Sequence, residues 1–326
     1  MIYKKRTMPN ELKGLLSLDK RLPNNHIKKP EVKKNLLICQ AGYNGELELD
    51  AHINEFKPNY RHAILHDLYL QQDGAYFQID SLLITPSSIT IIEVKNYKDK
   101  TVIKANPTQF IRVFQNGDRK PMRNPYTEID LKIHLLKSWL GTRGIQIPID
   151  GLLTFTHTNE LAIKHPSPEI KTIFTYEAPA HFRSLPVNEH ILDGHAIHNL
   201  ANTMIEHHKD YNPFPLADRY DINPSDILPG VICSNCDRPG MKWGREKWNC
   251  PSCGHTSKTE HHQTVQDWFM LIKPKMTNSD FRYFTQLNNR NVARGLLAKS
   301  GLQLIGERKA AHYVLMKEGK SPTPVE

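Results

Sequence analysis

The stretch IIEVKNY, residues 91–97, places a carboxylate and an ammonium group two residues apart in a strand that is otherwise apolar. Side chains alternate between the two faces of a strand, so Glu93 and Lys95 share one face. The preceding run YFQIDSLLI, residues 76–84, is also β-rich, and the intervening TPSS fits a type I turn with proline at its second position. Together they predict a hairpin that is apolar on both sides and central in a covered sheet.

The length of the turn decides which residues of the predicted hairpin face each other. A four-residue loop centred between Pro86 and Ser87 sets a single antiparallel register. The predicted pairs are Ile84–Ile89, Leu82–Ile91, Asp80–Glu93 and Gln78–Lys95. The face that these residues share is therefore apolar near the turn and charged at its far end.

The charged end of the hairpin has the chemistry of a metal site. Two carboxylates on directly opposed residues, with Cβ atoms about 5 Å apart, repel each other unless a cation lies between them. Asp80 and Glu93 therefore predict a site for Mg²⁺ or Mn²⁺, which prefer carboxylate and water oxygens. Lys95 would orient or help to deprotonate a water on that ion, or stabilise charge that develops on phosphorus. The alternative is a set of charges at a strand end in which Lys95 bridges the two acids.

Helical patterns flank the hairpin. In GYNGELELDAHINEF an apolar stripe contains Leu49, Ile53 and Phe56, and Glu46 falls on the same stripe. Glu46 is either a further ligand or a first-turn acid that offsets the helix dipole. The run NPYTEIDLKIHLLKSWL predicts another helix, GLLTFTHT a further strand, and LPVNEHILDGHAIHNLANTMIEHH one or two helices. This order of elements indicates an α/β sandwich.

Three ordered motifs resemble the nuclease-related domain (NERD) family of the PD-(D/E)xK nuclease superfamily. They are GYNGE with Glu46, FQIDSLLI with Asp80, and IIEVKNY with Glu93 and Lys95, within residues 37–155. The resemblance implies a restriction-endonuclease-like mixed sheet sandwiched by helices. It also implies a metal-dependent catalytic centre made of Asp80, Glu93 and Lys95, with Glu46 as its helix-borne acid.

The sequence departs from the family pattern at two positions. Glu128, in NPYTE, stands where the family usually has a glutamine, and Ile79 precedes Asp80 where the superfamily name has a proline. We keep Glu128 as a candidate catalytic residue, since its carboxylate would also bond a metal-bound water.

Four of the five cysteines form two CxxC pairs. CSNC, thirteen further residues and CPSC contain Cys233, Cys236, Cys250 and Cys253. Each pair forms a tight turn and the intervening segment is long enough for a hairpin, which predicts a tetrahedral zinc site in a zinc ribbon over residues 231–260. Thiolates fill all four positions, so we expect the site to be closed and structural.

The segment between the cysteine pairs carries two tryptophans among basic residues. Trp243 and Trp248 alternate with Lys242, Arg245 and Lys247. The aromatic rings would stack on bases while the cations hold phosphates. They would equally serve as the small core of the ribbon or as a protein-contact surface, and these alternatives stay open.

Residues 261–316 predict a C-terminal helix–hairpin module. The run TNSDFRYFTQLNNRNVARGLLAKSG contains two helices, and LQLIGERKAAHYVL a hairpin with a basic tip. This order resembles a truncated winged-helix DNA-binding module, with a helical cap or a dimerisation element as the alternative.

The charge distribution favours a polyanionic partner. The chain of 326 residues has a formal net charge of +9. Residues 1–34 hold ten Lys/Arg against three acids, and residues 271–320 again hold ten against three. Phosphate backbones are bound mainly by such side chains, although solubility alone is an alternative reason for basic ends. No apolar run approaches the roughly 20 residues of a membrane helix and no signal-peptide pattern opens the chain, so we expect no membrane contact and a cytoplasmic location.

These patterns give a domain map and a function. The predicted parts are a basic N-terminal segment (1–36), the nuclease-related α/β domain (37–215), a linker (216–230), the zinc ribbon (231–260), the C-terminal module (261–316) and a tail (317–326). The predicted function is Mg²⁺-dependent hydrolysis of phosphodiester bonds in DNA, with the C-terminal modules aiding nucleic-acid binding. The alternatives are a non-catalytic nucleic-acid-binding adaptor and a zinc-ribbon scaffold for another protein.

Overall fold

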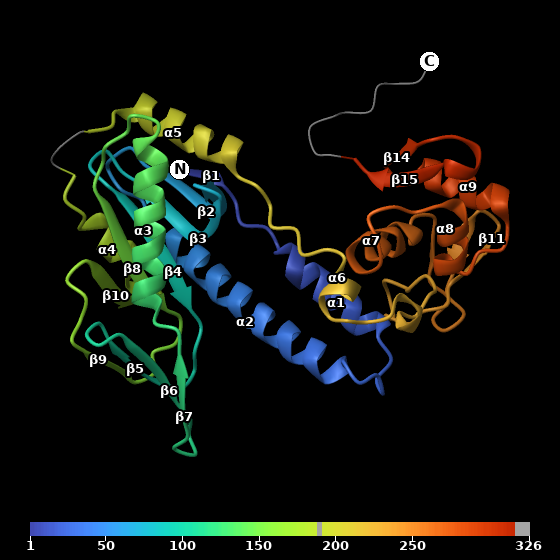
Figure 1. The fold of residues 1–326 in the computed structure, drawn as a ribbon, viewed down its shortest axis with the longest axis horizontal. Helices are drawn as coiled ribbons and strands as arrows, with labels where there is room; N and C mark the ends of the chain where they lie inside the picture. Colours follow the sequence, from blue (N-terminus) through green and yellow to red (C-terminus); the bar gives the residue numbers. More distant parts are fainter. Residues whose placement is uncertain (188–190, 317–326) are drawn as a thin grey trace. The chain divides into compact units, whose positions relative to one another are not determined.

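The computed structural model describes residues 1–187 and 191–316, which form two compact units (Figure 1). The first unit contains Met1–Met8 and Cys39–Tyr211, and the second contains Pro9–Ile38 and the chain from Asn212 onward. The basic N-terminal segment is thus divided between the units. The predicted tail at 317–326 lies outside the described residues, and the predicted domain boundaries stay a prediction.

A six-stranded mixed sheet forms the centre of the first unit, with the strand order β1-β2-β3-β4-β8-β10. Its strands are β1 (Ile2–Lys4), β2 (Ala63–Gln72), β3 (Ala75–Ile84), β4 (Ile89–Lys95), β8 (Ile149–Phe155) and β10 (Ile170–Phe174). The pairs β2–β3 and β3–β4 are antiparallel, whereas β1–β2, β4–β8 and β8–β10 are parallel. The predicted mixed α/β fold is confirmed.

Helices cover both faces of this sheet (Figure 1). The helices of the unit are α2 (Lys29–Ile53, shared with the second unit), α3 (Pro125–Gly141), η1 (Thr175–Glu177), α4 (Ala178–Arg183) and α5 (Gly194–His207). On one face Leu82 and Ile91 join an apolar cluster with α3 and α5. On the other face Leu83 and Ile92 join a cluster with α2 and α4. Apolar burial on both faces explains why these strands have few polar residues.

Near its turn, the hairpin of β3 and β4 has the register that the sequence predicts, whereas the predicted pairs Asp80–Glu93 and Gln78–Lys95 lie beyond the ladder. Leu82 pairs with Ile91 and Ile84 with Ile89. In the turn, the Thr85 N–H donates to the Ser88 carbonyl over 2.9 Å. The turn length and the apolar pattern therefore suffice to align these two strands.

Helix α2 is longer than the sequence analysis predicted. It begins at Lys29, whereas the apolar stripe indicated a start near Gly42. Pro30 occupies the first turn, where proline costs no helical hydrogen bond, and the following residues include the helix formers leucine and alanine. The stripe was visible only where the helix packs on the sheet. Of the segment predicted as one or two helices, α5 is helical, and residues 188–190 lie outside the described part.

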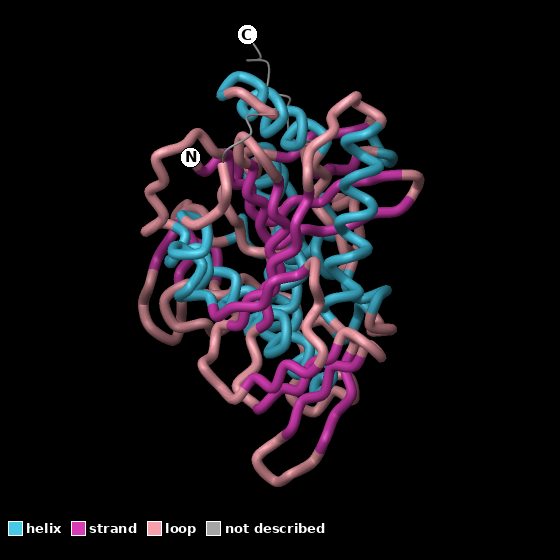
Figure 2. Tube along the Cα trace, turned by 90° about the vertical axis from the view of Figure 1, so that its left-hand side faces the viewer, coloured by secondary structure: helices cyan, strands magenta, loops and turns pink. Residues whose placement is uncertain are grey.

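A second, four-stranded sheet in this unit was not among the predicted elements. Its strand order is β7-β6-β5-β9, and Figure 2 shows its strands below the six-stranded sheet of the same unit. The strands are β5 (Lys100–Lys104), β6 (Gln109–Val113), β7 (Arg119–Met122) and β9 (Leu161–Lys164). The chain passes directly from β7 into α3, so this sheet is joined to the helix that faces β4.

The second unit contains short helices and two small sheets. Its elements are α1 (Asn10–Arg21), α6 (Leu216–Arg219), η2 (Pro224–Asp226), β11 (Lys242–Gly244), β12 (Lys247–Asn249), β13 (Thr256–Ser257), α7 (His261–Leu271), α8 (Asn278–Thr285), α9 (Arg290–Ala298), β14 (Leu302–Ile305), η3 (Arg308–Ala310) and β15 (His312–Leu315). Helix α7 precedes the two helices and hairpin that the sequence analysis expected in the C-terminal module. No helix in the described part of the chain is long and apolar enough to cross a membrane.

A buried ion pair holds α1 in the second unit. Arg21 donates to Asp267 of α7, and the two side chains are 1% and 3% exposed. Arg21 also donates to the carbonyl oxygens of Leu228 and Gly230, each over 3.0 Å. The guanidinium thereby ties α1 to α7 and to residues 216–230, which we expected to form a linker. In that segment the side chain of Ile227 is fully buried.

Candidate functional site

The two acids of the hairpin lie where the ladder between β3 and β4 ends. Its last pair is Ser81–Ile92, so Asp80 and Glu93 lie one step beyond it. One oxygen of the Asp80 carboxylate, Oδ2, accepts the backbone N–H of Val94 over 2.9 Å. The Asp80 side chain thus accepts the hydrogen bond of this amide at the point where the backbone pairing of β3 and β4 ends. Glu93 remains in register on its other side, with β8.

Two lysines hold the Glu93 carboxylate. Lys95 Nζ donates to Glu93 Oε1 over 2.8 Å and to Glu128 Oε2 over 2.9 Å. Lys132 Nζ pairs with Glu93 Oε2 and lies 3.9 Å from Asp80 Oδ1. Sequence reasoning missed Lys132, although it follows Glu128 by four residues in the predicted helix. That spacing puts both side chains on one helix face and was the available signal.

The charges in this cluster change each other's protonation. Burial raises the pKa of Asp80, and the nearby Glu93 raises it further, while the two lysines oppose the shift. Burial alone would also raise the pKa of Glu93, but Lys132 and Lys95 outweigh it and lower the pKa. Burial would lower the pKa of Lys95, but Glu93 and Glu128 outweigh it and raise the pKa. Lys95 is therefore a cation here, suited to stabilising negative charge rather than to accepting a proton.

Glu46 reaches the cluster through an arginine from the N-terminal segment. Arg6 Nη1 lies 2.8 Å from Glu46 Oε2, and Arg6 Nη2 donates to the Asp80 carbonyl oxygen over 2.8 Å. The Arg6 side chain is 2% exposed and also pairs with Asp50 over 2.8 Å. Burial raises the pKa of Glu46 to about 8, with Asp80 adding to the shift and Arg6 opposing it. Nothing local in the sequence signalled Arg6, because its partners are 40 or more positions away.

A buried histidine lies beside Arg6 and its partners. His66 Nδ1 lies 2.8 Å from Ser81 Oγ and 3.2 Å from Asp50 Oδ1. Burial lowers the pKa of His66 to about 4, against the attraction of Asp50. The ring is therefore neutral at neutral pH, and it contacts Ser81 of β3 without adding charge.

The structure brings all five predicted residues into one network. Asp80, Glu93, Lys95 and Glu128 are joined by lysine contacts, and Glu46 is joined through Arg6. The chemical roles assigned to them stay a prediction.

The acidic pair fits a divalent cation in its donor chemistry. Asp80 Oδ1 and Glu93 Oε2 face the same Lys132 ammonium, so a positive charge already lies between the two carboxylates. Carboxylate oxygens of this kind are the donors that Mg²⁺ and Mn²⁺ prefer. A metal ion at this position would compete with the lysine.

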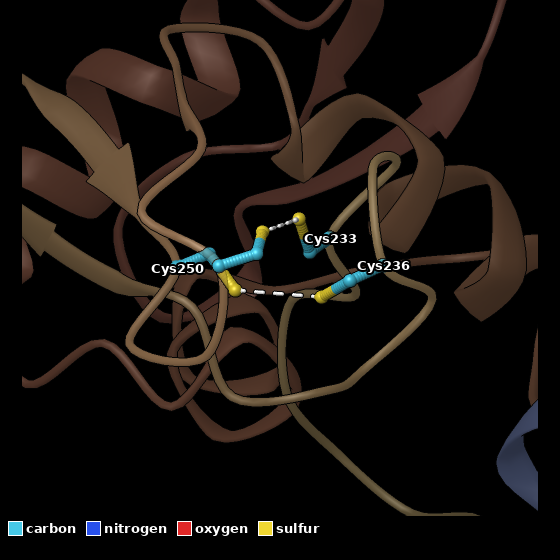
Figure 3. Close-up of side chains that lie close together, drawn as sticks. Cys233, Cys236 and Cys250 are labelled. Atoms are coloured by element: carbon cyan, nitrogen blue, oxygen red, sulfur yellow. Dashed lines mark hydrogen bonds between the residues drawn. The ribbon is translucent and has the colours of Figure 1, made fainter.

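The four cysteines form a cluster with the geometry of the expected metal site. Among the described residues, these four cysteines are a group of candidate metal ligands whose Sγ atoms all lie within 4.8 Å of one another. Figure 3 shows Cys233, Cys236 and Cys250 converging on one point. The contacts Cys233–Cys253 and Cys236–Cys250 are 3.7 and 3.6 Å, too long for a disulfide. They match the S···S edges of about 3.8 Å that a tetrahedron with Zn–S bonds of about 2.3 Å requires.

Two equivalent turns present these thiols. The residue after each pair, Asp237 or Gly254, has a positive φ of 54° or 74°. Its N–H donates back to the carbonyl of the first cysteine, Cys233 over 2.9 Å or Cys250 over 3.0 Å. Each CxxC pair therefore forms a tight turn that brings its two thiols together. Strands β11 and β12 form the predicted hairpin between the pairs. These features confirm the zinc ribbon.

The tryptophans of the ribbon divide between the alternatives. Trp248 is 1% exposed and its Nε1 donates to His261 Nδ1 over 3.1 Å, so it belongs to the core and does not present a face to bases. Trp243 packs edge-on against Trp248 with ring centroids 5.3 Å apart, and it keeps part of its surface in solvent.

One comparison with known proteins finds a match. The family model described as nuclease-related domain matches residues 41–156. No curated protein and no solved structure matches the chain. The matched segment contains the five predicted residues and Lys132, whereas Arg6 and the cysteines lie outside it. Residues 41–156 of this chain therefore form a nuclease-related domain.

Proposed function

We propose that this protein is a metal-dependent nuclease that hydrolyses phosphodiester bonds in DNA. The observation that carries the proposal is the contiguous, largely buried network of Asp80, Glu93 and Lys95 inside the nuclease-related domain. Buried ionisable groups with shifted pKa values are concentrated at functional sites. The network lies at the C-terminal end of β4, an interior strand of the six-stranded sheet.

Each residue of the network has a role in this proposal. Asp80 and Glu93 would hold Mg²⁺ or Mn²⁺, which supplies an activated water and charge stabilisation when bound. Lys95 carries the positive charge that stabilises the developing phosphorane. Glu128 positions Lys95 by accepting its second hydrogen bond. Lys132 balances the two acids, and Glu46 with Arg6 holds the Asp80 backbone.

In this proposal the second unit binds nucleic acid and does not take part in the reaction. Four cysteines would fill all positions of its zinc site, and such a closed site would be structural. Helices α8 and α9 are joined by four residues, beginning with Gln286 at φ 57°, a turn length typical of helix-turn-helix modules. The outer side of α9 exposes Arg290, Asn291 and Arg294, side-chain types that read base edges. We include DNA as the partner and a reducing, cytoplasmic location in the proposal.

A second candidate is a non-catalytic adaptor that keeps the nuclease-like fold. One observation favours it: Lys95 and Lys132 occupy both oxygens of Glu93. A site neutralised in this way can be purely structural. A zinc-ribbon scaffold for another protein is the third candidate, and it requires no nucleic-acid binding at all.

Incubation of the purified full chain with single- and double-stranded DNA and RNA, with Mg²⁺ or Mn²⁺, tests the proposal. We expect DNA cleavage that Asp80→Ala and Lys95→Ala reduce by about 10²–10³-fold or more. The variants should retain the zinc content of the wild type. Absence of cleavage, or equal cleavage by the variants, would contradict catalysis. Salt-dependent binding without cleavage would support the adaptor, and no binding the scaffold.

A further inference from the structure

The sheet of β5, β6, β7 and β9 has one buried face and one basic face. Ile103, Phe110 and Met122 pack into the apolar cluster beneath α3. Because side chains alternate along a strand, the residues between them point the other way. Four of these are cations: Lys100, Lys104, Arg119 and Lys164. None of the residues that these strands place on that face is acidic.

Two lysines lie side by side on this face. Lys104 on β5 is in register with Lys164 on β9. Like charges on directly neighbouring strands destabilise a sheet by a few tenths of a kcal/mol or more. The acids nearest in the chain bind other cations: Glu160 pairs with Lys100, and Asp99 pairs with Arg112. The arrangement therefore favours an external anion.

The like-charged pair is part of a row that leads to the candidate centre. Lys104 is also in register with Gln109 on β6. Continuing the β6–β7 register by one residue places Arg123 beside Gln109. The side-chain amide of Asn124 fixes this position, since it donates to the carbonyl oxygens of Lys104 over 2.7 Å and Gln109 over 3.1 Å. We call Lys164, Lys104, Gln109 and Arg123 the basic row.

The inner end of the basic row contacts the network of acids and lysines. Arg123 Nε lies 3.6 Å from Glu128 Oε1, and the Arg123 side chain is 70% exposed. Glu128 in turn accepts from Lys95 over 2.9 Å. An anion bound along the row therefore reaches the candidate centre through Arg123.

The size of the row suits a nucleic-acid backbone. Neighbouring strands lie about 4.8 Å apart, so four strands span about 14 Å. One strand of B-DNA advances about 3.4 Å per phosphate, which makes the row as long as about four nucleotides. Protection of sheet edges, a common reason for lysines in strands, does not explain Lys104, because β5 is an interior strand.

We propose that the basic row binds the phosphate backbone of a DNA substrate and directs it to the network at the end of β4. The inference rests on the proposed function in taking DNA as the partner of this domain. It adds a binding surface that the charge distribution of the sequence did not indicate, since the basic ends of the chain lie elsewhere.

The test compares two triple variants of the full chain that lose the same charge. The first is Lys104→Ala, Arg123→Ala and Lys164→Ala. The control removes two lysines and one arginine that are exposed elsewhere in the first unit: Lys57→Ala, Lys137→Ala and Arg183→Ala. Fluorescence anisotropy with a duplex DNA of mixed sequence gives the affinity between about 50 and 200 mM salt. The buffer contains no added divalent cation and no chelator, so bound zinc is kept.

We expect the row variant alone to lose affinity and salt dependence. At about 0.9 per lost phosphate contact, the slope of log K against log salt should become shallower by about 2.7. The control should keep the wild-type slope, and circular dichroism should show that both variants are folded. Equal slopes for the two variants, or no DNA binding by the wild type, would overturn the inference. Binding through the row without cleavage in Mg²⁺ would leave it standing and would refute only the proposed nuclease.

Discussion

Lys132→Met is the substitution that tests most directly how the acidic pair is balanced. It keeps the apolar stem of the side chain in α3 but removes the ammonium that lies between Asp80 and Glu93. Removing one partner of a buried ion pair costs about 3–5 kcal/mol. We expect about 3 kcal/mol, since Lys95 still holds one oxygen of Glu93. For a unit of about 150–250 residues this lowers Tm by about 6–12 °C.

A divalent cation should recover most of that loss. If Mg²⁺ binds Asp80 and Glu93, it has no competing ammonium in the variant. In the wild type it must compete with the Lys132 ammonium. At a Mg²⁺ concentration of about 100 times Kd, binding stabilises the folded state by about 2.7 kcal/mol. The rise in Tm on adding Mg²⁺ should therefore be several degrees larger in the variant than in the wild type.

Thermal unfolding followed by circular dichroism, with and without MgCl₂, measures both effects. Lys137→Met is the matched control, because it lies on the same helix and is exposed. Its Tm and its response to Mg²⁺ should equal those of the wild type. The reasoning is refuted if Lys132→Met unfolds at the wild-type temperature, or if Mg²⁺ stabilises the variant and the wild type equally.

Three further predictions concern the second unit. Asp267→Ala leaves the Arg21 guanidinium buried without its carboxylate and should lower the free energy of unfolding of this unit by about 3–5 kcal/mol, measured by urea unfolding. The double variant Arg21→Met, Asp267→Leu should recover much of this loss. Equal stability of Asp267→Ala and the wild type would contradict the prediction. Cys250→Ser should lose the stoichiometric zinc that metal analysis detects. Cys39→Ser should retain this zinc, since Cys39 is outside the four-thiol cluster. Zinc retained by both variants would exclude the assigned site. Burial lowers the pKa of His261 to about 4, below its ordinary value of about 6.5, so the unfolded state binds the additional proton. Stability conferred by the neutral ring should therefore be complete above about pH 6.5 and fall by up to about 1.4 kcal/mol per pH unit down to about pH 4. His261→Asn is compared with the wild type at each pH, because protonation of the thiolates affects both proteins. The free energy of unfolding of His261→Asn should fall less steeply as the pH is lowered. Identical declines in the two proteins would reject the role assigned to His261.

The hairpin and the zinc ribbon were predictable because their signals are local. The period-two apolar pattern and a four-residue turn align Leu82 with Ile91, as the structure confirms. The cysteine spacing fixes two short turns, and the thiols then need only a hairpin to meet. In both cases the residues that contact each other are separated by a connection short enough to constrain their geometry.

The second sheet and the true extent of the helices were not predictable in the same way. The strands β5 to β7 are short, and their solvent face mixes lysine and arginine with valine and isoleucine, so no clear alternation marks them. Helix α2 begins 13 residues before Gly42, in a stretch whose apolar side chains do not pack on the sheet. Periodicity reveals an element where a stripe of its side chains is buried, and it is weak in residues 29–41, where Val32 alone is buried.

The sequence by itself determined the acids and the lysine at the end of the hairpin, the four cysteines that cluster and the mixed α/β class. Tertiary structure alone decided what neutralises those acids. Lys132 comes from a helix on one face of the sheet, and Arg6 comes from the N-terminal segment, 74 positions before the Asp80 carbonyl that it contacts. It also decided that Lys104 and Lys164 lie side by side. The physical reason is that a charge acts over a few ångströms of space, whatever its distance along the chain.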